Sequence, residues 1–252
     1  MERSEPSTRR VVVIGGWGCH SRWLDDFRAS FKRLALDVHL VDLPGYHSGS
    51  GAASLEADIL NTQSFDTLLE NWFQNTSGLI ESSPNTLLIG WSYGAMLAVQ
   101  MSARLSKPCQ VIGLGARPRF IEDPFSVFDE GTSQAFLQRM VRSPLKGLEY
   151  FISLTGQGEA KSQLLLLKQD VRDALPAEPA VLKASLEHLY RLDVTDAWHH
   201  LKMKGLLSDL YFKDDSLIAS PEKRDNNIEG CHLAPVAHGA HVANALIPLI
   251  RT

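Results

Sequence analysis

The stretch Thr86-Leu87-Leu88-Ile89-Gly90-Trp91-Ser92-Tyr93-Gly94 carries the strongest local signal in this chain of 252 residues. Its first part is a mostly apolar run that predicts a buried strand, and the Ala- and Met-rich run over 93–105 predicts a helix directly after it. A serine between two glycines at such a junction is typical of a nucleophile elbow, because only small neighbours fit a turn this tight. An ordinary strand-to-helix turn built from small residues is the alternative.

The sequence on both sides repeats this alternation. Apolar runs at 11–14, 38–42 and 109–114 predict strands, and apolar residues at helical spacing predict a helix over 65–80. Nearly continuous apolar strands separated by helices indicate a parallel sheet covered on both faces. The pattern resumes late in the chain. We expect a strand at 206–211, a short strand near 231–233 and a terminal helix over 240–250.

The segment between these two parts has a different pattern. From about 120 to 198 it lacks good strand runs, and helical stretches cover 133–141, 145–154, 159–174 and 179–189. Proline and glycine residues separate these stretches. The chain is therefore predicted to be an α/β protein with a sheet core from 1–119 and 199–252, and an inserted all-helical cap from 120–198.

Composition excludes several classes of protein. A net charge of −4 and a pI of about 6.1 argue against a general nucleic-acid binder. No apolar run reaches the roughly 18 residues of a membrane span, and Met1–Pro6 lacks the apolar segment of a secretory signal. The widely spaced Cys19, Cys109 and Cys231 predict reduced thiols rather than a disulfide framework or a zinc site. We expect a cytoplasmic protein with no membrane partner.

A serine hydroxyl is a weak nucleophile and needs a base, which in turn needs an orienting acid. In this type of fold the three follow the chain order serine, acid, histidine. Asp214 and Asp215 follow the late strand, and His238 and His241 precede the last helix. The small neighbours of His238 favour it as the base, with His241 as the alternative.

Two backbone N–H groups are candidates for an oxyanion hole. The N–H of Tyr93 lies at a helix N-terminus, where developing negative charge is stabilised. The second donor should come from the loop after the first strand, where Gly15-Gly16-Trp17-Gly18 offers the N–H of Trp17. The spacing of these glycines does not match a dinucleotide-binding loop.

Together these residues resemble a known family, the α/β hydrolases, and within it the small carboxylesterases that hydrolyse pimeloyl-acyl carrier protein methyl ester in biotin synthesis. The resemblance rests on Gly16-Trp17-Gly18, Val41-Asp42-Leu43-Pro44-Gly45, Gly90-Trp91-Ser92-Tyr93-Gly94, Leu210-Tyr211 with Asp215-Ser216-Leu217-Ile218, and Ala237-His238. It implies an α/β-hydrolase fold with a helical cap, and an enzyme that needs no metal and no organic cofactor.

The resemblance also implies roles for individual residues. Ser92 is expected to be the nucleophile, Asp215 the acid and His238 the base. Trp17 and Tyr93 are expected to supply the oxyanion donors. The entrance of the substrate pocket is expected to be lined by Gly16, Trp17, Trp91 and Tyr93. The chain departs from the family at Gly15, where a histidine is usual, and in the short distance from Asp215 to His238, which requires a compact or degenerate last unit.

The predicted cap is more basic than the rest of the chain. Between Leu137 and Arg172 it has six basic and three acidic residues. Such a surface would steer an acidic partner, and the resemblance makes that partner an acyl carrier protein. The expected docking residues are Arg139, Arg142, Lys146, Lys161 and Arg172. Ordinary solvent-facing charges are the alternative.

The leading hypothesis is therefore a monomeric serine carboxylesterase acting on this carrier-protein ester. A general short-chain esterase, a thioesterase, a lactonase or a C–C bond hydrolase would keep the same three residues with another substrate. A binding module that has kept the fold without catalysis is a third hypothesis.

Overall fold

The computed structural model describes residues 9–34, 36–46, 65–121, 123–124, 126, 128–218 and 227–250. Met1–Pro6 lies outside these residues. No helix among the described residues is long and apolar enough to cross a membrane. The three cysteines are free thiols, and Cys19 and Cys231 are buried.

The core is a five-stranded sheet in which all paired strands are parallel, as the sequence predicts. Its order is β2-β1-β3-β4-β5. The strands are β1 (Arg10–Ile14), β2 (Asp37–Val41), β3 (Thr86–Trp91), β4 (Gln110–Leu114) and β5 (Leu207–Leu210). The central strand β3 is buried along its whole length, which explains its unbroken apolar sequence. Since Ile14 pairs with Gly90 and Trp91 with Leu114, the carboxyl ends of β1, β3 and β4 lie together at one edge.

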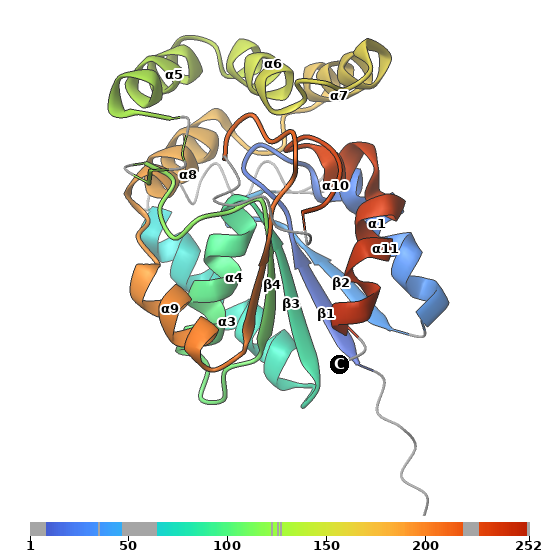
Figure 1. Ribbon diagram of the computed structural model, residues 1–252. Coiled ribbons are helices and arrows are strands. Elements are labelled where there is room, and N and C mark those ends of the chain that lie inside the picture. The colour runs from blue at the N-terminus through green and yellow to red at the C-terminus, as the bar shows by residue number, and fades with distance from the viewer. Residues whose placement is uncertain are drawn as a thin grey trace, which may run out of the picture.

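Helices cover both faces of the sheet (Figure 1). On one face α1 (Asp25–Phe31) packs against α11 (Gly239–Ile250), and on the other α4 (Tyr93–Arg104) packs against α9 (Thr195–Met203) and lies near α3 (Phe65–Glu81). Two short 3₁₀ turns, Ser21–Leu24 and Lys32–Leu34, flank α1. The sequence predicted α3, α4 and α11. It did not predict α1 and α9, which have only seven and nine residues.

Four helices form between β4 and α9, close to the ranges predicted for the cap. They are α5 (Glu130–Arg142), α6 (Pro144–Thr155), α7 (Lys161–Asp173) and α8 (Pro179–Arg191). Local sequence fixes their starts: Asp129 caps α5 by accepting the N–H of Thr132 at 2.7 Å, and prolines begin α6 and α8. Helices α5, α6 and α7 lie as a layer over the carboxyl edge of the sheet (Figure 1). Helix α8 contacts both α5 and α3, so it connects this layer to the core.

After β5, the described residues form only an incomplete strand–helix unit. The short strand expected near Cys231-His232-Leu233 is wrong: this segment forms a turn that leads into the single helical turn α10 (Ala234–Ala237). In its place Phe212 and Ile228 form an isolated parallel bridge. Three backbone hydrogen bonds join the two segments there, from Ile228 N–H to Tyr211 O, Lys213 N–H to Ile228 O and Asp214 N–H to Gly230 O. The segment that leads to Asp215 and the segment that leads to Cys231-His232-Leu233 therefore lie side by side.

Candidate active site

Ser92 lies at the turn between β3 and α4 and has a strained backbone. Its φ is 55° and its ψ −124°, and among the described residues it is the only non-glycine residue with positive φ. Its N–H donates to the Leu114 carbonyl at 2.8 Å, which ties the turn to the neighbouring strand. A residue held in such a conformation is a mark of a functional site, because the surrounding structure must compensate for the strain. The side chain is 7% exposed.

The two glycines around Ser92 are required by backbone packing. A Cβ atom on Gly90 would lie 2.3 Å from Ala95 Cα, and one on Gly94 would lie 2.4 Å from the carbonyl oxygens of Ile14 and Gly15. Neither position can accept a side chain without moving main chain. The steric reason given for the glycines from the sequence is thus confirmed.

Asp215 is fixed in the loop after β5. Its carboxylate Oδ1 accepts the N–H groups of Leu217 at 2.8 Å and Ile218 at 3.0 Å. Its Oδ2 lies 2.8 Å from Nδ1 of His232, and both side chains are 1% exposed. Gly115 leaves room for the carboxylate, since a Cβ there would lie 3.2 Å from Oδ2. The neighbouring Asp214 is exposed, so the geometry favours Asp215 over Asp214 as the acid.

His232 is held between Asp215 and the residue before the serine. The indole N–H of Trp91 donates to the His232 carbonyl at 2.9 Å, and the two rings lie 5.7 Å apart. An imidazole that donates Nδ1–H to a carboxylate has its lone pair on Nε2. Here Nε2 is buried and makes no hydrogen bond to any residue the structure describes. His232 therefore has the environment of a general base, and it contacts Trp91, the residue before Ser92.

The prediction that His238 pairs with the acid is wrong. Its Nε2 lies 2.9 Å from Oε2 of Glu159 in the segment between α6 and α7, and its side chain is 52% exposed. The turn of α10 carries the chain away from Asp215 between His232 and His238, so the later histidine faces the surface. The alternative, His241, is exposed on α11.

Sequence reasoning missed His232 because it judged each histidine by its neighbours. A usable signal was present in the pairing of the last two strand-like segments. His232 follows Ile228 closely, and Asp215 follows Phe212 closely. Residues that follow paired segments of a parallel sheet meet at its carboxyl edge, where sites of such sheets gather.

The loop after β1 lies directly against the serine. A Cβ on Gly16 would lie 3.3 Å from the Cβ of Ser92, so Gly16 packs against the serine and Trp17 is the next residue of the loop. Tyr93 is the first residue of α4, where helix N–H groups have no acceptor within the helix. The two residues predicted to supply oxyanion donors thus lie next to positions that adjoin Ser92, one on the loop after β1 and one at the start of α4.

Aromatic side chains from the cap enclose this region. The Trp17 ring meets Phe151 of α6 and Phe136 of α5 edge-on, with centroids 5.1 and 5.8 Å apart. Trp17, Trp91 and Tyr93 are all buried, and so is Gly16. An apolar enclosure of this kind suits an acyl chain and excludes water from the reacting atoms.

Cys231 lies beside His232, but its environment keeps it unreactive. Burial raises the pKa of this thiol to about 12, and its Sγ lies 3.3 Å from Oε1 of Glu159. A thiol with a high pKa stays protonated and is a poor nucleophile. Ser92 therefore remains the candidate nucleophile. Among the described residues, no group of three or more His, Cys, Asp or Glu side chains is arranged to hold a metal ion.

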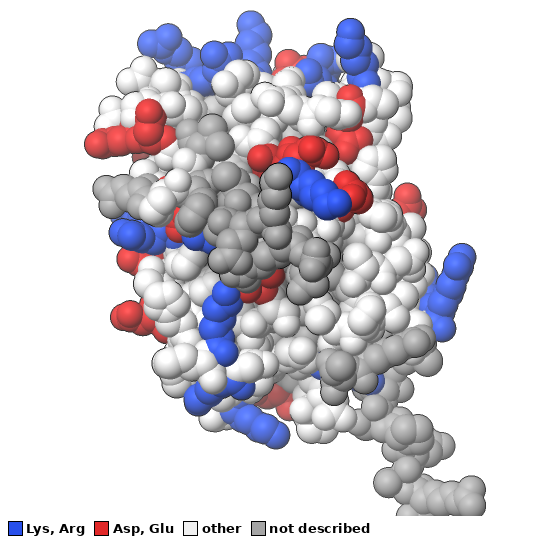
Figure 2. All heavy atoms as spheres, in the orientation of Figure 1, with Lys and Arg blue, Asp and Glu red and all other residues white. Residues whose placement is uncertain are grey.

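All five basic residues expected to dock a partner are exposed on the cap. Lysine and arginine atoms gather along the edge of the molecule formed by α5, α6 and α7 (Figure 2). Two of them have neighbours on the cap itself: Arg172 pairs with Glu149 at 2.5 Å, and Arg139 lies 4.5 Å over the ring of Tyr150.

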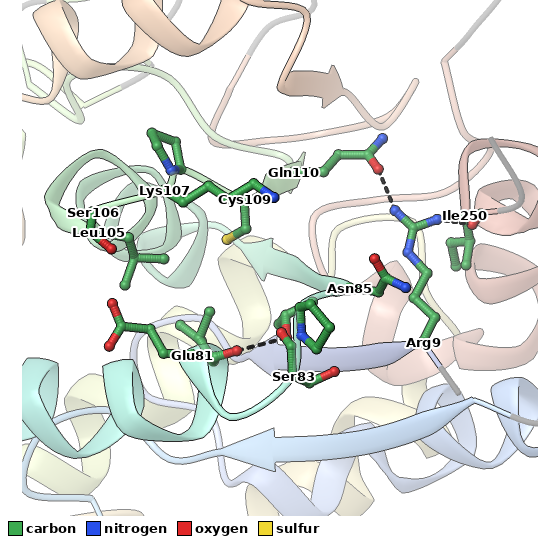
Figure 3. Close-up of a pocket in the computed structure, with 14 residues that line it drawn as sticks. Arg9, Glu81, Ser83, Asn85, Leu105, Ser106, Lys107, Cys109, Gln110 and Ile250 are labelled. Carbon is green, nitrogen blue, oxygen red and sulfur yellow. Dashed lines mark hydrogen bonds between the residues drawn. The ribbon is translucent and has the colours of Figure 1, made fainter. Parts of the chain in front are cut away.

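A hollow of about 740 Å³ lies far from these residues. Arg9, Asn85, Cys109 and Gln110 line it, and each stands at the amino end of a strand (Figure 3). Arg9 donates to the side chain of Gln110 across it at 2.5 Å. The hollow is at the opposite end of the sheet from Ser92 and takes no part in the candidate site.

The fold and the arrangement of Ser92, Asp215 and His232 are those of an α/β hydrolase with the site of a carboxylic ester hydrolase. The chain belongs to the alpha/beta hydrolase family, whose sequence pattern matches residues 11–245.

Individual relatives have more specific names than the family. The chain is 28% identical to the pimeloyl-[acyl-carrier protein] methyl ester esterase of Vibrio cholerae, over 89% of this chain and 82% of that protein. It is 35% identical to the biotin biosynthesis bifunctional protein BioHC of Cellvibrio japonicus over 66% of this chain, but spans only 31% of that longer protein.

Solved structures show the same fold. A hydrolase from Oleispira antarctica matches with a TM-score of 0.75 at 17% identity, covering 98% of this chain and 92% of that one. The esterase EaEST from Exiguobacterium antarcticum matches with a TM-score of 0.72 at 14% identity, covering 98% and 93%.

Proposed function

We propose that the chain hydrolyses the methyl ester of pimeloyl-acyl carrier protein, yielding methanol and the free carboxylic acid for biotin synthesis. One observation supports the catalytic part of this proposal. Asp215 and His232 pair at 2.8 Å, and Nε2 of His232 is buried without any described partner, while Ser92 has a strained backbone. The names of the relatives from Vibrio cholerae and Cellvibrio japonicus support the substrate.

The proposed reaction uses the chemistry of these three side chains. Nε2 of His232 accepts the hydroxyl proton as Ser92 Oγ attacks the ester carbonyl, and Asp215 stabilises the imidazolium that forms. The N–H groups of Trp17 and Tyr93 hold the oxyanion. His232 then donates the proton to the departing methanol. A water, deprotonated by the same Nε2, hydrolyses the acyl-enzyme, and the product leaves as a carboxylate.

The cap supplies the two features that a carrier-protein substrate needs. Its inner aromatic residues form apolar walls for the acyl chain. Its outer surface combines the exposed Arg139, Arg142, Lys146, Lys161 and Arg172 with exposed apolar side chains such as Leu165 and Leu166. Acyl carrier proteins are acidic, so the basic residues would raise the rate of encounter and the apolar ones would contribute contact area.

The site is complete within one chain, and we therefore propose a monomer that acts on the carrier protein in the cytoplasm. The mechanism uses only side chains and backbone groups of this chain and water.

Methanol release from methyl-pimeloyl-acyl carrier protein tests the proposal. We expect Ser92→Ala and His232→Ala each to lower turnover by at least about 10⁴-fold, because Oγ of Ser92 and Nε2 of His232 act in both halves of the reaction. His238→Ala is the matched control and should leave turnover unchanged. Full activity of the His232 variant would contradict the assignment of the base.

A comparison of substrates separates the proposed enzyme from a general esterase or thioesterase. The proposed specificity predicts a higher kcat/KM for the carrier-protein methyl ester than for p-nitrophenyl butyrate or for pimeloyl thioesters without the methyl group. The reverse order of kcat/KM values would indicate a general hydrolase. If a phosphonate probe fails to label Ser92, the chain would instead be a binding module without catalysis.

A further inference from the structure

The side chain of Trp17 is anchored to the cap helix α8. Its indole N–H points at the Ser185 hydroxyl, 3.1 Å away, and at the Leu182 carbonyl, 3.2 Å away. Trp17 is 3% exposed and Ser185 is 0% exposed, so water does not compete for these contacts. The residue whose N–H is the proposed first oxyanion donor is therefore held by a helix outside the core.

The hydroxyl of Ser185 completes a closed network. It donates to the Leu182 carbonyl at 3.1 Å and lies 3.3 Å from the hydroxyl of Tyr46, which accepts the N–H of Gly18 at 3.2 Å. A serine hydroxyl has one proton and two acceptor sites. Donation to Leu182 leaves both acceptor sites for Trp17 and Tyr46. Burial raises the pKa of Tyr46, so its hydroxyl keeps the proton that this arrangement requires.

Helix α8 also contacts the residue with the second proposed donor. The hydroxyl of Tyr93 lies 2.8 Å from Nδ1 of His188, and the Tyr93 side chain is 0% exposed. Burial lowers the pKa of His188 and raises that of Tyr93, so a neutral imidazole and a protonated hydroxyl share this hydrogen bond. Ser185 and His188 are three residues apart and lie on the same side of the helix.

The loop that carries Trp17 needs such support. Three of the four residues in Gly15-Gly16-Trp17-Gly18 are glycines, and Gly18 has a φ of 73°. Glycine-rich backbone has many accessible conformations, so an ordered donor requires contacts from outside the loop. Within the loop, Trp17 alone has a side chain that can make them.

We propose that α8 positions the oxyanion hole, with Ser185 holding the Trp17 donor and His188 holding the Tyr93 donor. Both are positioning residues and touch no reacting atom. The inference rests on the proposed serine hydrolase mechanism and extends it: the cap then sets the rate of the chemical step as well as the choice of substrate. Loss of a whole oxyanion donor costs about 10²–10³-fold in kcat, and loosening one should cost about 10-fold.

The variants Ser185→Ala and His188→Leu remove one anchor each, and p-nitrophenyl butyrate reports on the chemistry without the carrier protein. We expect each variant to lower kcat about 10-fold with KM nearly unchanged, because the oxyanion exists only in the transition state. His188→Asn keeps an acceptor at the same position and should restore most of the rate. Trp17→Phe combined with Ser185→Ala should cost less than the product of the single effects, since both remove one shared hydrogen bond.

A second measurement separates positioning from simple loss of stability. The phosphoryl oxygen of a p-nitrophenyl alkylphosphonate occupies the oxyanion hole, so labelling of Ser92 should slow in parallel with kcat. Ser102→Ala is the matched control. Ser102 is a fully buried serine on α4 that donates to the Cys109 carbonyl at 2.7 Å, at the end of the helix far from Ser92. It should lower the melting temperature without changing kcat or labelling.

The outcomes are distinct. If the wild type is labelled at Ser92 but Ser185→Ala and His188→Leu keep the wild-type kcat and labelling rate, the inference is overturned and the proposed function stands. A loss of activity in Ser102→Ala as large as in Ser185→Ala also overturns it, because stability alone would then explain the effect. An unlabelled wild type refutes the proposed function and the inference with it.

Discussion

Replacing Asp215 with asparagine should abolish catalysis while leaving its loop in place. Oδ1 of Asp215 accepts the N–H groups of Leu217 and Ile218, and only an oxygen can accept them. The amide oxygen of an asparagine must therefore occupy the Oδ1 position. The amide NH₂ is then forced to the Oδ2 position, 2.8 Å from Nδ1 of His232, where it can only donate.

The consequence for His232 follows from its two nitrogens. With a donor facing it, Nδ1 must accept, so the proton moves to Nε2 and that atom can no longer take the proton of Ser92. In serine proteases the equivalent change of tautomer lowers kcat about 10⁴-fold, which corresponds to about 5 kcal/mol of the activation barrier. We expect a loss of this size, with a melting temperature close to that of the wild type.

The assay is hydrolysis of p-nitrophenyl butyrate, with Asp214→Asn as the matched control. Asp214 is the exposed neighbour in the same loop, so its variant should keep wild-type kcat. Retention of more than about a tenth of the wild-type kcat by Asp215→Asn would refute the reasoning, since the wrong tautomer cannot support that rate. The same loss in both variants would refute it as well, because the effect would then be one of loop charge.

Three further predictions concern the elbow and the cap. Gly94→Ala places a Cβ 2.4 Å from two carbonyl oxygens and should lower the free energy of unfolding by about 3 kcal/mol or more, as measured by urea denaturation; a stable variant would show that the turn can relax. Reversing the charges of Arg139, Arg142 and Arg172 together should lower kcat/KM for the carrier-protein substrate by about 10²-fold and leave small esters unaffected, and equal effects on both would argue against docking. Burial alone would raise the pKa of Asp170, but hydrogen bonds from Arg22 and Trp23 lower it below 3.8, so its stabilising effect is present above pH 3.8 and is lost as the pH falls through the lowered value. Asp170→Asn should therefore cost about 1 kcal/mol at neutral pH, allowing for solvent screening, and progressively less in acid, whereas a pH-independent difference in thermal unfolding would contradict this explanation.

The three inner strands β1, β3 and β4 were predictable because they are buried on both sides. Val11–Ile14 and Thr86–Trp91 have no polar face to obscure the apolar run, and observed strand ends fall within a residue or two of the predicted ones. The cap helices α6 and α8 were predictable for a different reason. The prolines at 144 and 179 mark where these two helices begin. The single turn α10 has too few residues for any periodicity to show.

The proposed nucleophile and the proposed base differed sharply in how far sequence could identify them. Ser92 has a short sequence signature, because both neighbouring glycines are required by close backbone contacts, Gly90 with Ala95 and Gly94 with Ile14 and Gly15. His232 has none: its role depends on a carboxylate in another loop and on where α10 sends the chain afterwards. The small neighbours of His238 favoured it as the base, but in the structure Gly239 is small because α11 begins against the backbone of Phe27, where a Cβ would lie 2.6 Å from a nitrogen atom.

The bridge between Phe212 and Ile228 has a consequence for the dynamics of the site. The three backbone hydrogen bonds at this bridge join the loop of Asp215 to the loop of His232. Neither loop can open alone without breaking them, so the acid and the base form one cooperative unit that opens and closes together. In hydrogen exchange the amides of Lys213, Asp214 and Ile228 should be protected to a similar degree and lose protection at the same denaturant concentration. The imidazole and its carboxylate would then keep their relative geometry through motions that displace either loop from Ser92.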